Sequence, residues 1–336
     1  MDTLSEGTKY VKAGLIGAGY WGKNLIRVFH QEEVLHTICD SNEKLLKTYQ
    51  DIYPDVNFTV NIENIINHKD INAIVVATPA STHYSIVKLA LENHKHVFCE
   101  KPLALNVKEA EELVKIAEDK KLILMVGHIL HYHPAVKKLK QLLKAGELGD
   151  IEYMYSNRTN IGRIRHEENI LWSFAPHDIS LMLSLTGCLP ATVISHGGIF
   201  LPHNVEDVTL TFFCFPGNIK AHIFVSWLNP FKEQKFVVIG NKKMAVFDDT
   251  EREKKLVTYQ HKISWNETEV PAIEKAEAEI IEIEKTEPLK EEVNHFISCV
   301  TNKEKPYTDG YESLNVLKVL EMAENSLKSS CKNQNV

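Results

Sequence analysis

The sequence predicts an α/β protein with an N-terminal doubly wound parallel sheet and a C-terminal α+β domain that has a large, mostly antiparallel open sheet. Over the first 130 residues, short apolar runs alternate with stretches of helical periodicity, a pattern that is typical of parallel sheets. After residue 150, strand-like runs with turn residues between them favour antiparallel pairing. A length of 336 residues fits two domains, which we place at 1–130 and 131–336, with the last helix free to pack back on the first domain.

The predicted elements of the first half follow one another in a regular order. The run 71–77 is apolar at nearly every position, which indicates a strand buried on both faces of a parallel sheet. The stretches between such runs carry apolar residues at helical spacing, as at Leu25, Ile26 and Phe29. We expect strands at 11–16, 34–39, 57–60, 71–77, 96–99 and 122–127, and helices at 23–30, 43–52, 84–92, 106–119 and 134–144.

The second half begins with a strand and an apolar helix and continues with a series of strand-like runs. In the run 219–228, apolar residues fall on both faces of the strand, with Val225 and Trp227 on one face and Phe224 on the other. Because a helix covers only one face of such a sheet, we expect the other face to pack on a second subunit, giving a homodimer or homotetramer. Analytical ultracentrifugation that gives only monomer at micromolar concentration would contradict this hypothesis. We place strands at 151–158, 191–200, 205–214, 219–228, 235–240 and 243–248, helices at 169–186, 289–301 and 310–329, and an edge strand with loops at 251–287.

Composition and charge narrow the class of protein. The chain is 44% hydrophobic and 25% charged, as is ordinary for a globular protein, and its net charge of -7 argues against a nucleic-acid partner. No apolar run is long enough to span a membrane, and the polar residues 1–10 lack the apolar core of a signal peptide. The six cysteines are scattered without metal-ligand spacing, so we expect free thiols, no bound metal and a cytoplasmic protein.

A glycine-rich turn links the first strand to the first helix and predicts a dinucleotide site of the Rossmann type. Gly17-Ala18-Gly19-Tyr20-Trp21-Gly22 has G-x-G-x-x-G spacing in the strand–turn–helix context that this motif requires. Gly17 allows the sharp turn, Gly19 lets the backbone approach the pyrophosphate, and Gly22 lets the helix pack close to the sheet. The start of the helix offers unpaired N–H groups and a partial positive charge to the phosphates.

Asp40 ends the second strand, 23 positions after Gly17, and decides which cofactor we expect. A carboxylate at this strand end is placed to accept hydrogen bonds from the ribose hydroxyls, and it repels a 2′-phosphate. No arginine lies nearby, although Lys44 and Lys47 follow on the next helix. The sequence therefore predicts NAD, with NADP as the second choice.

Polar residues follow the fourth and fifth strands, at the edge where doubly wound sheets bind their ligands. Pro102 restricts the backbone beside Lys101, and a cis bond before it would aim the lysine ammonium into the cleft. We expect the cofactor to be bordered by Thr78, Pro79 and His83 after the fourth strand and by Glu100 and Lys101 after the fifth.

Several motifs of this sequence occur together in one known family: Gly17–Gly22, Ala77-Thr78-Pro79 with His83, Glu100-Lys101-Pro102-Leu103-Ala104, the helix that holds His177, and Asp309-Gly310. With them the chain resembles the Gfo/Idh/MocA oxidoreductase family over nearly its whole length. The Glu-Lys-Pro element is the most specific part of the resemblance. The resemblance implies a nicotinamide-dependent oxidation or reduction of a sugar or cyclitol hydroxyl, in which Lys101 and His177 serve catalysis.

The two side chains that the resemblance implies suit this chemistry. Hydride leaves a carbinol carbon while the hydroxyl loses a proton, and a histidine with an ordinary pKa near ~6.5 can take that proton at neutral pH. A lysine ammonium can hold the oxygen and stabilise the negative charge that develops on it. The alternative interpretation is structural, with Lys101 as a solvated strand-end lysine and His177 as a hydrogen-bonded core histidine.

One position departs from the family pattern. Many relatives have an aspartate one helical turn before the catalytic histidine, where this chain has Ser173. A serine accepts a hydrogen bond but supplies no negative charge to stabilise an imidazolium, and Asp178 points about 100° around the helix. Either the base is tuned differently or the activity is weaker. A dinucleotide-binding regulator without turnover therefore stays open as an alternative of another class.

The arginine-rich segment 157–165 points to the substrate. Arg158, Arg163 and Arg165 can bind phosphate through their guanidinium forks, with Asn160 between them. The alternative is a solvated strand face that pairs with Glu167 and Glu168. The remaining expected sugar contacts are His128, Tyr132, Trp172 and His177.

This segment and the helix after it resemble the family branch that acts on nucleotide-linked sugars, in particular the UDP-N-acetylglucosamine 3-dehydrogenases. The resemblance implies oxidation of the 3-hydroxyl of a UDP-N-acetylhexosamine to a ketone, which a pathway aminotransferase would then consume. A dehydrogenase of free aldoses or inositols is the other enzyme interpretation. It predicts that Arg163 and Arg165 are dispensable.

Overall fold

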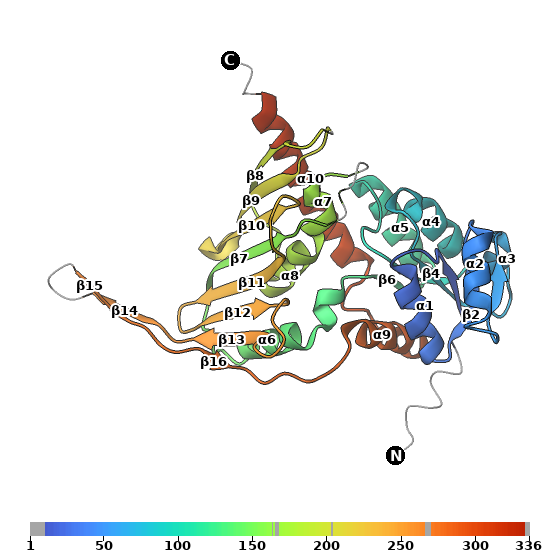
Figure 1. Ribbon diagram of the computed structural model, residues 1–336, viewed down its shortest axis with the longest axis horizontal. Coiled ribbons are helices and arrows are strands. Elements are labelled where there is room, and N and C mark those ends of the chain that lie inside the picture. The colour runs from blue at the N-terminus through green and yellow to red at the C-terminus, as the bar shows by residue number, and fades with distance from the viewer. Residues whose placement is uncertain (1–10, 163, 165–167, 203, 266–269, 333–336) are drawn as a thin grey trace. The chain divides into compact units, whose positions relative to one another are not determined.

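The computed structural model describes residues 11–162, 164, 168–202, 204–265 and 270–332, and the chain divides into two compact units (Figure 1). Unit 1 comprises Met1–Tyr132 and Thr286–Leu317, and unit 2 comprises His133–Lys285 and Lys318–Val336. The first boundary lies close to the predicted one at residue 130. The segment 286–317, which we placed in the second domain, belongs to unit 1.

Unit 1 is built on a six-stranded sheet whose neighbouring strands run parallel in the order β3-β2-β1-β4-β5-β6. The predicted parallel sheet is therefore confirmed. The strand order reverses between β1 and β4, so the carboxyl ends of these two strands mark the place where doubly wound sheets bind ligands. The strands are β1 Ala13–Ile16, β2 Leu35–Cys39, β3 Asn57–Thr59, β4 Ala73–Val76, β5 His96–Cys99 and β6 Leu124–Val126.

A helix from late in the sequence completes the core of unit 1. Phe296 of this helix, α9, packs against Phe29 and Phe98, with ring centroids 6.3 and 5.7 Å apart. Because all three rings are fully buried, the segment that carries Phe296 folds with the N-terminal sheet and not with the residues that precede it. The helices of unit 1 are α1 Gly22–Gln31, α2 Glu43–Gln50, α3 Glu63–Ile66, α4 His83–Glu92, α5 Val107–Asp119 and α9 Pro288–Asn302.

Unit 2 is built on an eight-stranded sheet in the order β16-β13-β12-β11-β7-β10-β9-β8. Strands β7 and β10 pair in parallel and the other neighbours are antiparallel, so the predicted large, mostly antiparallel sheet is confirmed. A separate two-stranded sheet, β14 with β15, lies in the segment that we predicted as edge strand and loop. The strands are β7 Ile151–Thr159, β8 Thr192–Gly198, β9 Val208–Cys214, β10 Lys220–Ser226, β11 Glu233–Gly240, β12 Met244–Asp248, β13 Leu256–Tyr259, β14 Lys262–Trp265, β15 Pro271–Glu274 and β16 Glu279–Ile280.

The apolar helix predicted at 169–186 is divided in the structure. Helix α7 covers Ile170–Phe174 and α8 covers Pro176–Thr186. Pro176 has no N–H group to donate to the preceding turn, so the hydrogen-bond ladder is interrupted there although Ala175 keeps helical dihedrals. The other helices with residues in unit 2 are α6 Pro134–Lys144 and α10 Gly310–Lys332, which begins in unit 1.

One face of the eight-stranded sheet is covered and the other is open. On the covered face, Ile223, Val225 and Trp227 are fully buried. On the open face, Ile194 of β8 and Phe212 of β9 are 47% and 44% exposed. The described part of unit 2 therefore leaves an apolar sheet surface in contact with solvent.

The cysteines whose side chains are described are all free: Cys39, Cys99, Cys188, Cys214 and Cys299. This agrees with the expectation of free thiols. Among the residues that the structure describes, no helix combines the length and the apolar character needed to cross a membrane.

Candidate active site

Glycines shape the turn between β1 and α1. Gly17 has a φ of +100°, and a Cβ atom there would lie 2.7 Å from the carbonyl group of Ala77, so this glycine seats the turn on the end of β4. A Cβ atom on Gly22 would lie 1.9 Å from the carbonyl oxygen of Gly17. At Gly19, by contrast, a Cβ atom would meet no described atom within 4 Å. The first and last glycines are thus required by packing, whereas Gly19 leaves open space beside the turn.

Asp40 closes this turn from the end of β2. Its Oδ2 accepts a hydrogen bond from the N–H of Ala18 at 2.8 Å, and its Oδ1 accepts one from the N–H of Asn42 at 2.8 Å. Each carboxylate oxygen keeps a lone pair for a further donor, so the group is oriented to receive ribose hydroxyls. Lys47, one of the two lysines that kept NADP open, pairs with Glu43 at 3.4 Å. This arrangement favours NAD over NADP.

The residues of unit 1 fit a bound NAD. The open space at Gly19 admits the pyrophosphate beside the start of α1, where helix N–H groups and the helix dipole attract anions. Asp40 is placed for the adenosine ribose, and Tyr20 and Trp21 are 78% and 37% exposed at the same turn. When bound, NAD supplies the carbon that accepts a hydride.

His83 joins two loops at the carboxyl edge of the sheet. Its Nε2 lies 2.9 Å from the carbonyl oxygen of Thr78, and its Nδ1 lies 2.7 Å from the carbonyl oxygen of Pro102. The ring that we predicted to border the cofactor is 1% exposed, and both of its nitrogens face backbone carbonyl groups. His83 positions the loops that carry Thr78-Pro79 and Lys101. The bond between Lys101 and Pro102 is cis.

Glu100 connects the glycine turn to the end of β6. Its Oε1 accepts a hydrogen bond from the indole N–H of Trp21, and a Cβ atom on Gly127 would lie 3.0 Å from that oxygen. Desolvation by the surrounding protein raises the pKa of Glu100 to about 7, although the Trp21 N–H and the charge of Lys101 act to lower it. This carboxyl group therefore changes its protonation near neutral pH, directly beside Lys101 in the sequence.

Lys101 has a buried, neutral histidine near it. His128 is 1% exposed, and burial together with the charge of Lys101 lowers its pKa to about 3. Its Nε2 lies 3.5 Å from Oε2 of Glu312, and the other oxygen of Glu312 lies 3.9 Å from Nε2 of His131. The protein therefore encloses the ring that we predicted to contact the substrate.

Tyr132 is also enclosed. It is 1% exposed within the hydrophobic core of unit 1, and its hydroxyl lies 2.9 Å from Nδ1 of His295 and 3.4 Å from Oγ1 of Thr308. Burial raises the pKa of Tyr132 far above its usual range, so the hydroxyl stays protonated. The hydroxyl that we predicted to contact a sugar thus has hydrogen-bond partners inside unit 1.

The sequence analysis missed two glutamates, Glu312 on α10 and Glu292 on α9. Glu292 is 1% exposed, and neither of its carboxylate oxygens has a hydrogen-bond partner among the described residues. Burial and the charge of Glu100 raise the pKa of Glu292 well above its usual range, which favours the protonated form of this carboxyl group. The burial of Glu292 could have been predicted from the sequence. Glu292 lies one turn from Phe296, on the helix face that belongs to the core.

The sequence around Glu312 also predicts part of what the structure shows. Its backbone N–H donates a hydrogen bond to Oδ1 of Asp309, which lies 2.8 Å away at the start of α10. The spacing Asp309-x-x-Glu312 is that of a capping box and predicts the start of a helix. It does not predict that the same glutamate reaches His128 and His131.

In unit 2, His177 is the second residue of α8 and is partly exposed. Ser173 lies in α7, on the other side of the break at Pro176, and is 5% exposed. Because Ala175 keeps helical dihedrals, Ser173 still precedes His177 by about one turn. The residue four positions before His177 is thus a buried serine hydroxyl.

Arg158 is enclosed in the interior of unit 2. Its Nε and Nη2 donate hydrogen bonds to the carboxylate of Asp178 at 2.7 and 3.1 Å, and the two residues are 9% and 1% exposed. A buried carboxylate thus occupies the guanidinium fork that we predicted to contact a substrate phosphate.

The other predicted substrate residues of unit 2 have different surroundings. Trp172 is partly exposed, and its indole N–H donates a hydrogen bond to Oε2 of Glu324 at 3.3 Å, which leaves the ring as its contact surface. Asn160 is partly exposed just after β7, where its backbone N–H donates to the carbonyl oxygen of Ser226 at 3.1 Å. Arg163 and Arg165 lie outside the described residues.

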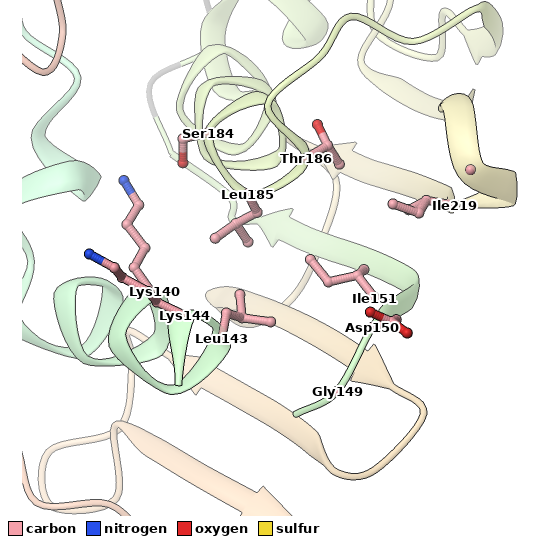
Figure 2. A pocket seen from close by; sticks show the side chains of 11 residues that line it. Lys140, Leu143, Lys144, Gly149, Asp150, Ile151, Ser184, Leu185, Thr186 and Ile219 are labelled. Atoms are coloured by element: carbon pink, nitrogen blue, oxygen red, sulfur yellow. The ribbon is translucent and has the colours of Figure 1, made fainter. Parts of the chain in front are cut away.

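A hollow of about 650 Å³ lies in unit 2 between the end of α6, the start of β7 and the end of α8 (Figure 2). Its lining includes Lys140, Lys144 and Thr186. His177 lies at the opposite end of α8, about 14 Å away along the helix. None of the predicted substrate residues lines this hollow, so it is not the predicted sugar site.

One group of side chains in the described structure has metal-ligand character. Ligand atoms of His36, His68 and Asp70 lie within 4.8 Å of one another. His36 is at the start of β2, whereas Asp40 follows its end, so this group lies away from the cofactor edge of the sheet. We assign it no part in the oxidoreductase site.

The parallel sheet, the glycine turn with Asp40, and a lysine on the loop after β5 define a dinucleotide-dependent oxidoreductase. Residues 11–128 match the oxidoreductase family described by its NAD-binding Rossmann fold, and residues 136–246 match the GFO/IDH/MocA C-terminal domain. The chain belongs to the Gfo/Idh/MocA oxidoreductase family and binds NAD. The predicted family and cofactor are confirmed.

Known proteins similar to this chain differ in the reactions that their names give. 2,7-Anhydro-N-acetylneuraminate hydratase of Escherichia coli K12 is 26% identical over 70% of this chain and 67% of its own. UDP-N-acetylglucosamine 3-dehydrogenase of Acidithiobacillus ferrooxidans is 23% identical over 92% of this chain and 94% of its own. A solved structure of that enzyme, GnnA, has a TM-score of 0.83 at 21% identity and covers 95% of this chain and 98% of its own. Levoglucosan dehydrogenase with NADH and levoglucosan has a TM-score of 0.83 at 18% identity and covers 95% of this chain and 97% of its own.

Proposed function

We propose that this protein is an NAD-dependent dehydrogenase that oxidises the 3-hydroxyl of a UDP-N-acetylhexosamine to a ketone. The observation that carries the proposal is the setting of Lys101, a partly exposed cation at the cofactor edge of the sheet, beside Glu100 and near the neutral His128. The similarity to a UDP-N-acetylglucosamine 3-dehydrogenase over 92% of the chain supports the substrate class.

In the proposed reaction, Lys101 and His177 divide the work on the hydroxyl group. The Lys101 ammonium holds the oxygen and stabilises the negative charge that develops on it, while His177 takes the proton. The hydrogen on the carbinol carbon leaves as a hydride, so two electrons pass from the sugar to NAD. Because His128 is neutral, it adds no positive charge that would repel the ammonium of Lys101.

The pairing of Arg158 with Asp178 bears on which residues we propose as phosphate contacts. The guanidinium of Arg158 is committed to Asp178, so we keep Arg163 and Arg165, together with Asn160, as partners of the diphosphate. Trp172 offers a ring surface on which a sugar or uracil can rest.

The test is an NADH absorbance assay across UDP-sugars, free sugars and inositols, with a coupled aminotransferase to remove an unstable ketosugar. We expect UDP-N-acetylhexosamines to give NADH and the aminotransferase to increase the yield. If UDP-sugars also fail to bind in calorimetry while free sugars are oxidised, the substrate assignment is wrong.

A dehydrogenase of free sugars or inositols is the second candidate. Two observations favour it: Arg158 is unavailable for phosphate, and levoglucosan dehydrogenase shares the fold with a TM-score of 0.83. The variants Arg163→Ala and Arg165→Ala separate the two candidates, because they should raise KM only if the substrate carries a diphosphate.

A regulator that binds NAD without turnover is the candidate of another class, and Ser173 motivates it. It predicts fluorescence quenching on NAD binding but no NADH formation with any sugar. Replacing Ser173 by Asp should then leave the protein inactive, whereas in an enzyme with a weakened base it should raise turnover.

We also propose that the chain forms a homodimer or homotetramer through the open face of the eight-stranded sheet. The exposed Ile194 and Phe212 on that face support this proposal. Sedimentation velocity of Phe212→Asp against the unchanged protein tests it, and equal mass for both at all concentrations would contradict it.

A further inference from the structure

Strands β14 and β15 form an arm that projects from the eight-stranded sheet of unit 2 (Figure 1). We define the arm as residues 262–265 and 271–274. It continues the pair of β13 and β16, and at its base the backbone N–H of Ala276 donates a hydrogen bond to Nδ1 of His261 at 3.0 Å. The arm is therefore anchored at one end.

The register of the arm separates apolar from polar side chains. Ile263 pairs with Ile273, and Trp265 pairs with Pro271. Because side chains alternate between the faces of a strand, these four lie on one face, which we call the apolar face of the arm. The other face carries the remaining pairs, Lys262 with Glu274 and Ser264 with Ala272.

The apolar face of the arm is uncovered in the described chain. Ile263, Trp265 and Ile273 are 62%, 73% and 63% exposed. A two-stranded hairpin is at best marginally stable by itself in water, and apolar side chains that stay this exposed add little burial to stabilise it. A sequence that keeps this alternation in an isolated arm indicates that something covers the apolar face.

The available area indicates what covers it. The apolar face of one arm offers on the order of 400 Å², so one arm laid on a partner buries roughly 800 Å² in total, no more than a crystal-packing contact. Two arms exchanged about a two-fold axis bury about 1,600 Å², the size of a standard stable interface. A second copy of this chain supplies that doubling, whereas an unrelated partner meets one arm only.

We propose that the arm is a dimer clasp whose apolar face packs on a second copy of the chain. The same unit carries a second uncovered apolar surface, the open sheet face with Ile194 and Phe212, and a two-fold pair presents both surfaces twice. The proposal rests on the self-association proposed above and adds the element that performs it. It is independent of the proposed dehydrogenase reaction.

A matched pair of variants tests the clasp by sedimentation velocity. Ile263→Asp with Ile273→Asp places two charges on the apolar face, and Ser264→Asp with Ala272→Asp places the same charges on the opposite face of the same strands. We expect the first pair to weaken self-association at least ~10-fold and the second to change it less than ~2-fold. Equal effects of the two pairs, no effect of the first, or a monomeric unchanged protein would each overturn the proposal.

A second measurement locates the contact without any substitution. Amide hydrogen exchange of the arm in the unchanged protein should slow as the concentration rises through the association range, because a covered hairpin opens less often. A dimer whose arm exchanges at the monomer rate would show that another surface makes the interface. NADH formation measured on the same samples separates this outcome from a failure of the proposed reaction, since the arm variants should retain it per subunit.

Discussion

The guanidinium of Arg158 and the carboxylate of Asp178 form a two-point ion pair inside unit 2, with N–O distances of 2.7 and 3.1 Å. The pair joins β7 to α8, the helix that begins with Pro176 and His177. Both carboxylate oxygens of Asp178, the residue after His177, accept hydrogen bonds in this pair. Asp178 thus fixes the helix that carries His177.

Breaking this pair should be costly. In Arg158→Met, the carboxylate of Asp178 stays buried without its cation, and we expect the free energy of unfolding to fall by about 3–5 kcal/mol. In Arg158→Met with Asp178→Leu, most of the loss should be recovered because no charge is left in the interior. Urea denaturation measures both, with Lys47→Met as the exposed control, expected to cost less than ~1 kcal/mol. A loss in Arg158→Met no larger than in this control would contradict the prediction.

Substitutions at two glycines of the turn should affect different properties, the stability of the fold in one case and cofactor binding in the other. Gly17→Ala puts a Cβ atom 2.7 Å from the Ala77 carbonyl group at a φ of +100°, so we expect a lower melting temperature. Gly19→Ala places its Cβ atom in open space, so the melting temperature of the cofactor-free protein should not change. Its affinity for NAD should fall at least ~10-fold, because the methyl group takes the room of the pyrophosphate. Thermal unfolding and NAD titration by fluorescence check the two halves, and equal melting losses in both variants would refute the contrast.

Glu100 should make stability depend on pH in a defined direction. Its pKa is about 7 in the folded protein against an ordinary 4.5, so the folded state binds the proton more tightly than the unfolded state. The contribution of Glu100 to stability is therefore complete below pH 4.5 and is lost as the pH rises through about 7. Denaturation of the cofactor-free protein and of Glu100→Gln across this range should give a difference that falls with rising pH. A difference that stays constant, or that grows, would show that the carboxyl group is not desolvated.

Lys101 and His177 should both be needed for turnover. We expect Lys101→Ala and His177→Ala each to lower kcat by at least ~10²-fold, the scale of general acid–base catalysis and charge stabilisation. The affinity for NAD should survive in His177→Ala, since the cofactor residues belong to unit 1. The exposed Lys108→Ala and His94→Asn serve as controls that should keep full activity. Turnover of either active-site variant at the level of its control would remove that residue from the mechanism.

The N-terminal sheet and its glycine turn could be predicted from the sequence because the patterns that indicate them are local. Apolar runs, helical spacing, and the positions of Gly17 and Asp40 all lie within 30 residues, and each part has its own physical role. The break at Pro176 could also have been predicted, since a proline inside a helical pattern marks an end or a kink. The single helix predicted at 169–186 ignored that signal.

The hydrogen-bond partners of the buried polar residues could not be predicted from the sequence. His83, His128, Tyr132 and Arg158 were predicted as ligand contacts from their residue types and their places near strand ends. The hydroxyl of Tyr132 meets His295, 163 positions away, and Arg158 meets Asp178, 20 positions away. Pairings over such distances depend on the packing of whole elements, so the sequence shows a polar side chain without showing whether water, a ligand or another residue receives it.

Helix α9 comes late in the sequence but packs in unit 1, and this limits the order in which the protein can fold. During synthesis the ribosome releases the six strands of the parallel sheet long before it adds Phe296, whose ring closes over Phe29 and Phe98. Until then the nascent sheet shows a bare aromatic surface. In a protein fragment that ends at residue 130, this surface is never covered. We expect such a fragment to precipitate or to need a chaperone. Adding the α9 peptide should restore its solubility.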